Sequence, residues 1–406
     1  MKETWMRKFA LIWAGQFISL ISSSAVNFAI IIWLSIETGS AETLAFAAIA
    51  ALLPQAIIGP FAGVYIDRWD RKKTMIFSDA FVALCTAFMA LNFYMGNQSL
   101  FFIYIMLGLR SVGSAFHMPA MQAAIPMLAP KDQLLRIAGI NQIIQSVSSI
   151  AGPALGALLI GLFSIGNVLL FDIIGAVFAI TSLLFVYIPN PEKAPDDDSS
   201  KLAKVWKDLR IGIVEVFRDK GITWMFIYSI IATFCILPVS VLFPLLTLNH
   251  FNGGKFEMSI IEIVWGVGML IGGGLIGIIK PTVRKIIFIN IMHIVLGLTF
   301  TISGILPTDA FILFTVLTVI GGAAASIYNA NFVAIIQEEI DPSKMGRVFS
   351  MFYSIAIIPS MIGLLSTGFV ADNIGVNLTF IILGAVISFV GIISFFTPSL
   401  MQLGKK

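Results

Sequence analysis

The sequence predicts an all-α membrane protein whose twelve transmembrane helices form two six-helix bundles. Three observations predict this fold class. First, 58% of the 406 residues are hydrophobic and only 12% are charged, against about 45–50% and about 25% in ordinary soluble domains. Second, apolar runs long enough to cross a bilayer recur along the whole chain. Third, the basic residues gather in alternate gaps between these runs.

The apolar runs define the expected helices. About twenty apolar residues cross the roughly 30 Å hydrocarbon core of a bilayer as a helix. The first run is too long for the apolar region of a signal peptide and lacks a small-residue cleavage site, so we expect it to stay as an anchor. The expected spans are approximately 9–36, 43–66, 74–95, 100–127, 137–163, 168–188, 222–248, 258–279, 286–306, 310–336, 345–371 and 376–396.

The basic residues give the orientation. Lys and Arg concentrate in the cytoplasmic loops of membrane proteins. If the N-terminus lies inside, all but two of the 25 Lys and Arg residues fall in inner segments. The exceptions are Lys255, in an outer turn, and Arg110, within the fourth span. One helix more or fewer would destroy this alternation, so we expect both termini to be cytoplasmic.

The two halves of the chain repeat each other. The segment GNVLLFDIIGAV, from Gly166, matches GVNLTFIILGAV, from Gly375, at seven of twelve positions. A duplication of six plus six helices explains this match. We therefore expect an N-terminal six-helix bundle over residues 1–188 and a C-terminal six-helix bundle over 222–406. Between them, 189–221 forms a cytoplasmic linker with an amphipathic segment on the membrane surface.

Duplicated bundles of this kind are typical of secondary transporters. The chain has no G-x-x-x-x-G-K-[ST] run, so we expect it to bind no ATP and to draw its energy from an ion gradient. The net charge of +3, without a basic stripe that includes aromatic residues, excludes nucleic acid as a partner. The 2 cysteines and 3 dispersed histidines offer no metal site, and we expect no cofactor.

Other classes of polytopic protein are the alternative. An intramembrane enzyme would need clustered nucleophiles, bases or metal ligands, and the sequence offers no such cluster. A receptor would not need a duplicated plan. We therefore expect a transporter and not an enzyme, with a small molecule and the lipid bilayer as its partners, acting as a monomer.

The turn between the second and third spans has a specific pattern. It resembles the inner-loop signature of the major facilitator superfamily, and the matching residues are Gly63, Asp67, Arg68, Arg71 and Lys72. The resemblance implies that the glycine allows close approach to a helix of the other half and that Asp67 and the arginines form an ion-pair latch on the inner side. An ordinary positive-inside loop would explain the basic residues but not the glycine or the Asp. The equivalent turn of the second half has no Asp, so we expect a one-sided latch.

The fifth span contains a second motif. Gly152-Pro153-x2-Gly156 resembles the antiporter signature of exporting members of this superfamily. Proline interrupts the hydrogen bonding of a helix backbone, and glycine lets a neighbouring helix pack closely. We therefore expect a functional bend at this point, although glycine and proline are also common in ordinary membrane helices.

Over nearly the whole chain, the sequence is similar to the macrolide-efflux branch of proton-coupled drug exporters. The strings IWAGQFISL, DRWDRKK, RSVGSAFHMPA and GRVFS are the basis of this resemblance. It implies the export of macrolide antibiotics in exchange for protons across a bacterial cytoplasmic membrane. An exporter of a siderophore or another metabolite, which would share the loop and antiporter signatures, is the alternative.

Ionisable groups inside the membrane are the candidates for proton coupling, because each costs at least about 2.5–3.5 kcal/mol there. Glu262 is the first candidate proton carrier and Asp172 the second. Arg110 keeps its proton at any relevant pH, so it can anchor a carboxylate but cannot carry the proton. Glu37 ends the first span at the outer face, where simple solvation is the alternative. We expect Asp79 to pair with the basic loop.

Polar residues at helical spacing are the candidates for a substrate cavity. In the fold that the resemblance implies, spans one, four, seven and ten line a central cavity. A wide and mostly apolar cavity suits an amphiphilic drug. The alternative is that these small polar residues only join membrane helices to one another. The candidate lining residues are Gln16, Ser19, Ser23, Asn27, Arg110, Ser114, His117, Gln142, Gln145, Tyr328 and Asn331.

Overall fold

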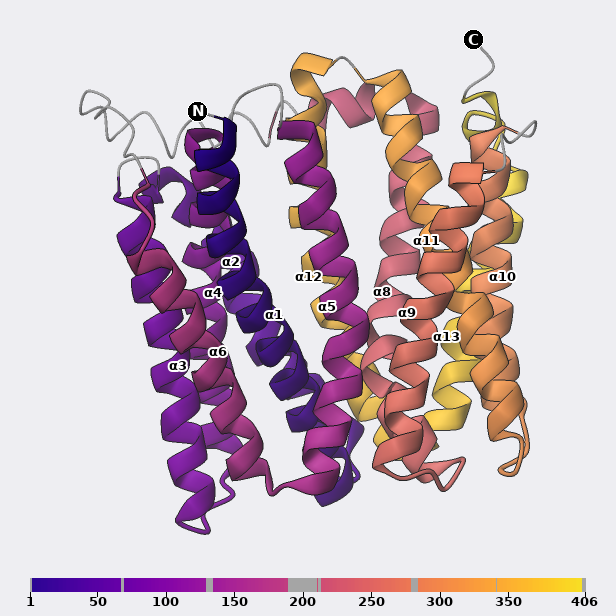
Figure 1. Cartoon of the computed structure of the whole chain (residues 1–406). Coiled ribbons are helices and arrows are strands. Elements are labelled where there is room, and N and C mark those ends of the chain that lie inside the picture. Colours follow the sequence, from indigo (N-terminus) through magenta and orange to yellow (C-terminus); the bar gives the residue numbers. More distant parts are fainter. Residues whose placement is uncertain are drawn as a thin grey trace. The chain divides into compact units, whose positions relative to one another are not determined.

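The computed structural model describes residues 2–66, 69–128, 134–188, 210, 213–278, 284–340 and 342–403. These residues form twelve long α-helices (Figure 1). Helices satisfy every backbone N–H and C=O internally, which lipid cannot do. The helices are α1 (Lys2–Thr38), α2 (Ala41–Ile66), α3 (Arg71–Tyr94), α4 (Leu100–Leu128), α5 (Leu134–Leu162), α6 (Ile165–Leu184), α8 (Lys220–Asn249), α9 (Lys255–Ile278), α10 (Lys285–Ile305), α11 (Phe311–Glu339), α12 (Pro342–Ile374) and α13 (Val376–Phe395).

The helices have the length and polarity of membrane spans. Within the described residues, 11 of them contain a stretch that is long and apolar enough to cross a membrane, and α5 contributes the shorter apolar stretch Ile150–Leu162. The predicted fold class is thus confirmed. Several helices extend a turn or two beyond the apolar runs, as α1 does by starting at Lys2. The apolar run marks the lipid core, whereas the backbone stays helical into the polar layer.

The chain divides into two compact units. The first unit consists of Met1–Trp33 and Phe46–Leu202, and the second of Leu34–Ala45 and Ala203–Lys406. The second unit therefore includes the end of α1 and the start of α2, which the predicted division into 1–188 and 222–406 assigns to the first half. The predicted linker falls mostly outside the described residues.

The carboxylate of Asp372 explains why the connection between α1 and α2 belongs to the second unit. Asp372, near the end of α12, accepts hydrogen bonds from the backbone N–H of Ala41 at 2.6 Å and of Glu42 at 3.0 Å, and from the hydroxyl of Ser40 at 2.7 Å. The first N–H groups of a helix have no partner within the helix. Asp372 satisfies two of them in α2 and places its negative charge at the positive end of the helix dipole.

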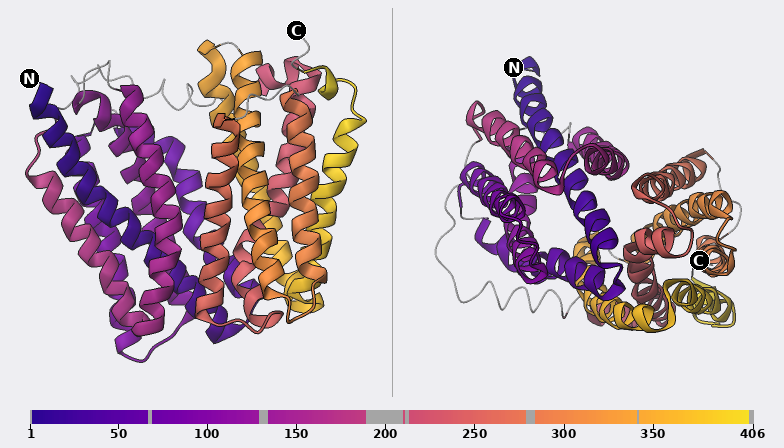
Figure 2. Two further views of the ribbon diagram at one scale, coloured as in Figure 1. Left: turned by 45° about the vertical axis from the view of Figure 1, so that its right-hand side comes forward. Right: turned by 90° about the horizontal axis from the view of Figure 1, so that it is seen from below.

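In the first unit, small residues bring helices into close contact with α1. A Cβ atom added at Gly156 of α5 would lie 2.3 Å from the carbonyl oxygen of Ala25, and one added at Gly175 of α6 would lie 1.9 Å from the hydroxyl of Ser22. At Gly156 the contact is with backbone, so only glycine fits there, whereas a larger residue at Gly175 would require the side chain of Ser22 to move. Also in this unit, α3 packs against both α4 and α6, and Figure 2 shows these helices running alongside one another.

The second unit has an aromatic core. Here α10 packs against α13, and α9 packs against α11. Phe243 of α8 lies at the centre of this core, and its ring is 5.6–6.1 Å from the rings of Trp265, Phe300, Phe314 and Phe380. Ring pairs at such distances add to the stability that burial alone provides.

Gly156→Ala should lower the thermal stability of the purified protein. The added methyl group would overlap the backbone of Ala25, and overpacking of this kind costs about 1–3 kcal/mol. Gly161→Ala is the matched control, because it lies on the same helix and a Cβ atom there meets nothing within 4 Å. Thermal unfolding in detergent compares the two variants. Equal melting temperatures would contradict the close contact between α5 and α1.

Candidate functional site

A buried ion pair joins α4 to α6 in the first unit. Arg110 Nη2 lies 3.0 Å from Asp172 Oδ2, and the two side chains are only 6% and 2% exposed. Both helices begin at the same end of the unit, so the two residues lie at similar depth. Each charge alone would be costly in a membrane, and the pair compensates both charges at short range.

Neutral side chains complete this pair. The hydroxyl of Ser23 donates to Asp172 Oδ1, and the hydroxyl of Thr86 donates to Asp172 Oδ2 at 2.8 Å. On the other side, Arg110 Nη2 donates to Asn27 Oδ1 at 3.1 Å. Side chains of α1, α3, α4 and α6 therefore meet at one point. Arg110 Nη1 is buried and has no hydrogen-bond partner among the described residues, so this site can take one further acceptor.

A second buried pair lies in the same unit. His117 Nε2 of α4 is 3.2 Å from Asp79 Oδ1 of α3, and Gln16 of α1 donates from Nε2 to Asp79 Oδ2 at 3.3 Å. All three side chains are buried. The expectation that Asp79 pairs with the basic loop is therefore wrong. Asp79 faces the interior of the bundle, where α4 and α1 present polar groups to it.

The two pairs form one polar column. Each of α1, α3 and α4 contributes to both pairs. The spacing is seven positions on each helix, between Gln16 and Ser23, between Asp79 and Thr86, and between Arg110 and His117, and α1 adds Asn27 to the first pair. Seven residues are about two helical turns, or about 10 Å. Between the pairs, Ser114 of α4 donates to the carbonyl oxygen of Arg110 at 3.1 Å. Polar groups thus continue along the interior of an otherwise apolar unit.

Neutralising one member of the ion pair between Arg110 and Asp172 should destabilise the protein more than neutralising both. Asp172→Asn or Arg110→Gln alone leaves an uncompensated buried charge, at a cost of about 3–5 kcal/mol. The double variant leaves no charge, and its two amides can hydrogen-bond to each other. Thermal unfolding of both single variants and the double variant measures this coupling. Additive losses in the double variant would contradict a direct ion pair.

The two glutamates proposed for proton coupling have different surroundings. Glu262 lies on α9 and is half-buried, and its carboxylate makes no hydrogen bond or ion pair with the described residues. Arg110, which could anchor a carboxylate, pairs with Asp172. Glu37 is exposed near the end of α1. Of the carboxylates predicted for coupling, the structure therefore brings only Asp172 to a described cation.

The predicted cavity residues lie on α1 and α4, on α11, and on α5. Those on α1 and α4 belong to the first unit. Gln16, Ser23, Asn27, Arg110 and His117 belong to the polar column, where they join helices of the first unit. Ser114 lies between its two pairs, and Ser19 is half-buried on α1.

The remaining cavity candidates lie on α11 and α5. The ring of Tyr328 is 4.7 Å from that of His293, a buried histidine whose two ring nitrogens have no hydrogen-bond partner among the described residues. Asn331 donates to the carbonyl oxygen of Ile327 in its own helix at 2.8 Å. Gln142 and Gln145 belong to α5, but their side chains lie outside the described part of the chain.

The predicted inner-loop latch is described only in part. Asp67 and Arg68 lie outside the described residues, Gly63 belongs to α2, and Arg71 is half-buried at the start of α3. Lys72 has a defined role within the first unit. Its ammonium donates to the carbonyl oxygen of Leu184, the last residue of α6, at 3.1 Å and to that of Val186, just beyond the helix, at 2.9 Å. This contact caps α6, because the last carbonyls of a helix have no partner within it.

The predicted antiporter motif lies at a close contact between α5 and α1. Gly152 and Pro153 are buried, and Pro153 lies within α5. A Cβ atom at Gly152 would lie 2.0 Å from the hydroxyl of Ser24. Gly156, one turn further along, meets α1 in the same way. The functional bend at this motif stays a prediction.

Thr86 and the contacts of Asp79 are the parts of the column that sequence reasoning missed. For Thr86, depth provides a signal. Counted from the nearer helix end, Thr86 of α3 lies at about the same level as Arg110 and Asp172. A polar residue at the level of two opposite charges is a candidate partner for them, because buried polar groups are almost always hydrogen-bonded.

Comparison with known proteins identifies the family. The family model of the Major Facilitator Superfamily matches residues 12–310. Macrolide efflux protein A of Streptococcus pyogenes is 36% identical over 404 residues, which cover 100% of this chain and 99% of that protein. The protein of the same name from Enterococcus faecalis is 35% identical over 326 residues, which cover 80% of this chain and 100% of that protein.

A solved structure shows the same fold. The crystal structure of a POT family transporter in complex with a thioalcohol conjugated peptide aligns with a TM-score of 0.75, covering 97% of this chain and 96% of that one at 13% sequence identity. At such low identity the likeness concerns the fold alone. Together with the family match and the full-length similarity to macrolide efflux proteins, it establishes that this chain is a membrane transporter that belongs to the Major Facilitator Superfamily, in its macrolide-efflux branch.

Proposed function

We propose that this protein is a secondary active exporter that moves amphiphilic antibiotics, macrolides foremost, out of the bacterial cytoplasm in exchange for protons. The similarity to two proteins named for macrolide efflux, one over 100% of this chain and the other over 80%, is the observation that carries the proposal. The lack of a nucleotide-binding loop in the sequence supports an ion gradient as the source of energy.

Proton exchange needs an acid side chain whose charge can be gained and lost within the membrane. Asp172 has a permanent cation beside it and two hydroxyl donors, so its negative charge is compensated. Glu262 has no such partner among the described residues. A bound proton can neutralise it in place of a cation. We therefore assign the transported proton to Glu262 and the positioning of α1, α3, α4 and α6 to Asp172 and Arg110.

We propose that both termini lie in the cytoplasm, because the basic segments between the spans all fall on the side of the termini. An even number of spans puts the two termini on one side of the membrane, and the basic segments place that side in the cytoplasm. A proton that enters from outside then moves down the membrane potential, which supplies about 2.3 kcal/mol per 100 mV. A monomer is sufficient for this cycle, because each chain has both halves.

Cells that express the protein should accumulate less macrolide than cells that do not. A proton uncoupler should abolish the difference, because it removes the gradient that drives export. Accumulation of a labelled macrolide, with and without uncoupler, measures both effects. Unchanged accumulation on expression would overturn the macrolide assignment and leave the siderophore or metabolite exporter as the alternative. A difference that survives the uncoupler would overturn proton coupling.

Glu262→Gln should abolish proton-driven export while substrate binding remains, because glutamine keeps the shape of the side chain but cannot exchange a proton. Glu37→Gln is the matched control, since Glu37 is exposed at a helix end. Efflux from loaded cells and macrolide binding to the purified variants provide the two measurements. Gradient-driven export by the Glu262 variant at the normal rate would remove this residue from the mechanism.

A further inference from the structure

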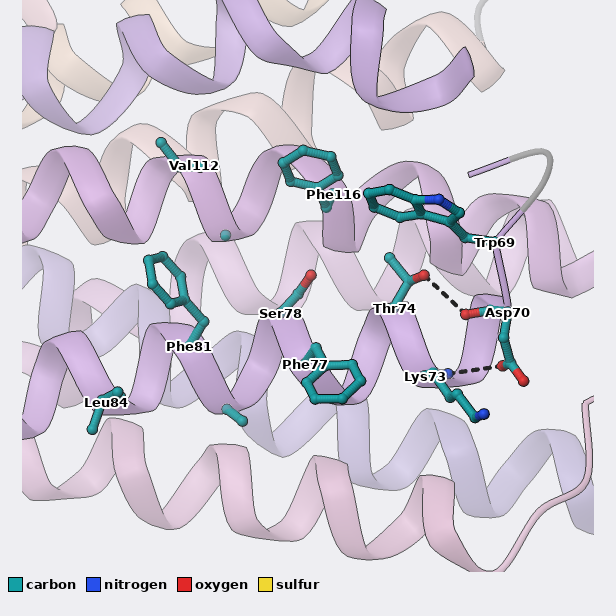
Figure 3. Close-up of a pocket in the computed structure, with 12 residues that line it drawn as sticks. Trp69, Asp70, Lys73, Thr74, Phe77, Ser78, Phe81, Leu84, Val112 and Phe116 are labelled. Carbon is teal, nitrogen blue, oxygen red and sulfur yellow. Dashed lines mark hydrogen bonds between the residues drawn. The ribbon is translucent and has the colours of Figure 1, made fainter. Parts of the chain in front are cut away.

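A long groove lies between α3 and α4, apart from the polar column. It has a volume of about 870 Å³ and opens to the surface of the first unit (Figure 3). Its walls are mainly aromatic and aliphatic. The stacked pair of Trp69 and Phe116, with ring centroids 5.9 Å apart, closes one end. None of the transport residues proposed above lines this groove.

Small residues of both helices line the groove where α3 and α4 meet. Gly113 of α4 and Ala80 of α3 both line it. A Cβ atom at Gly113 would lie 2.7 Å from Val82 Cγ2 and 3.2 Å from Phe81 Cδ1, so the two helices meet closely at this level. Larger side chains, such as those of Phe77, Phe81 and Phe116, form the walls of the groove.

The groove runs lengthwise along α3. Lys73, Phe77, Phe81 and Leu84 follow one another along its edge at steps of three and four residues, as Figure 3 shows. From Lys73 to Leu84 the helix rises about 16 Å. Phe77 is 71% exposed and Leu84 is 52% exposed. An extended apolar chain fits such a shape better than a compact ring does, because it can contact every wall residue in turn.

A cation stands at one end of the groove. The side chain of Lys73 is exposed, and its ammonium makes no hydrogen bond or ion pair with the described residues. Asp70, next to it, uses a carboxylate oxygen to cap α3 through the backbone N–H of Lys73 at 2.9 Å. Trp69 is half exposed at the same level. Tryptophan and lysine at the end of a span lie at the depth of lipid headgroups.

We propose that this groove binds an anionic phospholipid from the leaflet on the side of the N-terminus. One acyl chain lies along Phe77, Phe81 and Leu84, and the phosphate contacts the ammonium of Lys73. Charge complementarity favours this occupant, because the cytoplasmic leaflet is rich in anionic lipids that attract basic residues. The inference does not depend on what the transporter exports.

The test uses the purified full-length protein, stripped of lipid in detergent and titrated with phosphatidylglycerol whose acyl chains are brominated. Bromine quenches only nearby tryptophans, so Trp69→Phe defines the share of quenching that comes from the groove. We expect Lys73→Gln to weaken this component about five- to tenfold. Ala80→Phe should abolish it by filling the groove. Glycerol phosphate, which has no acyl chains, should not compete.

Two matched variants serve as controls. Lys220→Gln removes an exposed lysine from the first turn of α8, which also follows a capping Asp. Leu91→Phe enlarges an exposed side chain of α3 outside the groove. Both should bind the lipid as the unmodified protein does.

Several results would overturn the proposal. Lys73→Gln and Ala80→Phe could leave the Trp69-dependent quenching unchanged, or no such component could be found. Brominated phosphatidylcholine could bind equally well with and without Lys73, which would contradict the role of the cation. Displacement of the lipid by a macrolide, with no effect of Lys73→Gln, would assign the groove to the transported compound instead.

Discussion

Charge compensation inside the membrane is the constraint on which the first unit depends. An isolated guanidinium or carboxylate at this depth would raise the free energy of the folded protein, and the direct contact between Arg110 and Asp172 offsets part of that cost. The contact requires α4 and α6 to hold fixed depths. Because Ser23 and Thr86 also donate to Asp172, it constrains α1 and α3 as well.

The helix α1 links this network to the packing of the unit. Its small residues Ser22 and Ala25 receive the glycines of α6 and α5. Its polar residues Gln16, Ser23 and Asn27 bond to the two buried pairs. A shift of α1 would therefore disturb the close glycine contacts and the hydrogen bonds together. The helix packing of this unit and the compensation of its buried charges therefore depend on each other.

The number and position of the helices could be predicted from the sequence, because the thickness of a bilayer sets the length of an apolar run. The partners of the buried charges could not be predicted in the same way. Asp172 has the same chemistry whether it faces lipid or Arg110, and only the packing of α3 against both α4 and α6 decides between them. For Asp79, proximity in sequence to the basic loop favoured the wrong partner, since the rotation of α3 turns this side chain inward to His117.

Transport by purified protein in sealed vesicles tests the central claim, that export is driven by proton exchange, most directly. The account predicts that an imposed pH gradient or membrane potential drives a macrolide against its concentration gradient, and that this uptake stops when ionophores dissipate both. Concentrative movement at an undiminished rate in vesicles without any pH or voltage difference would contradict it.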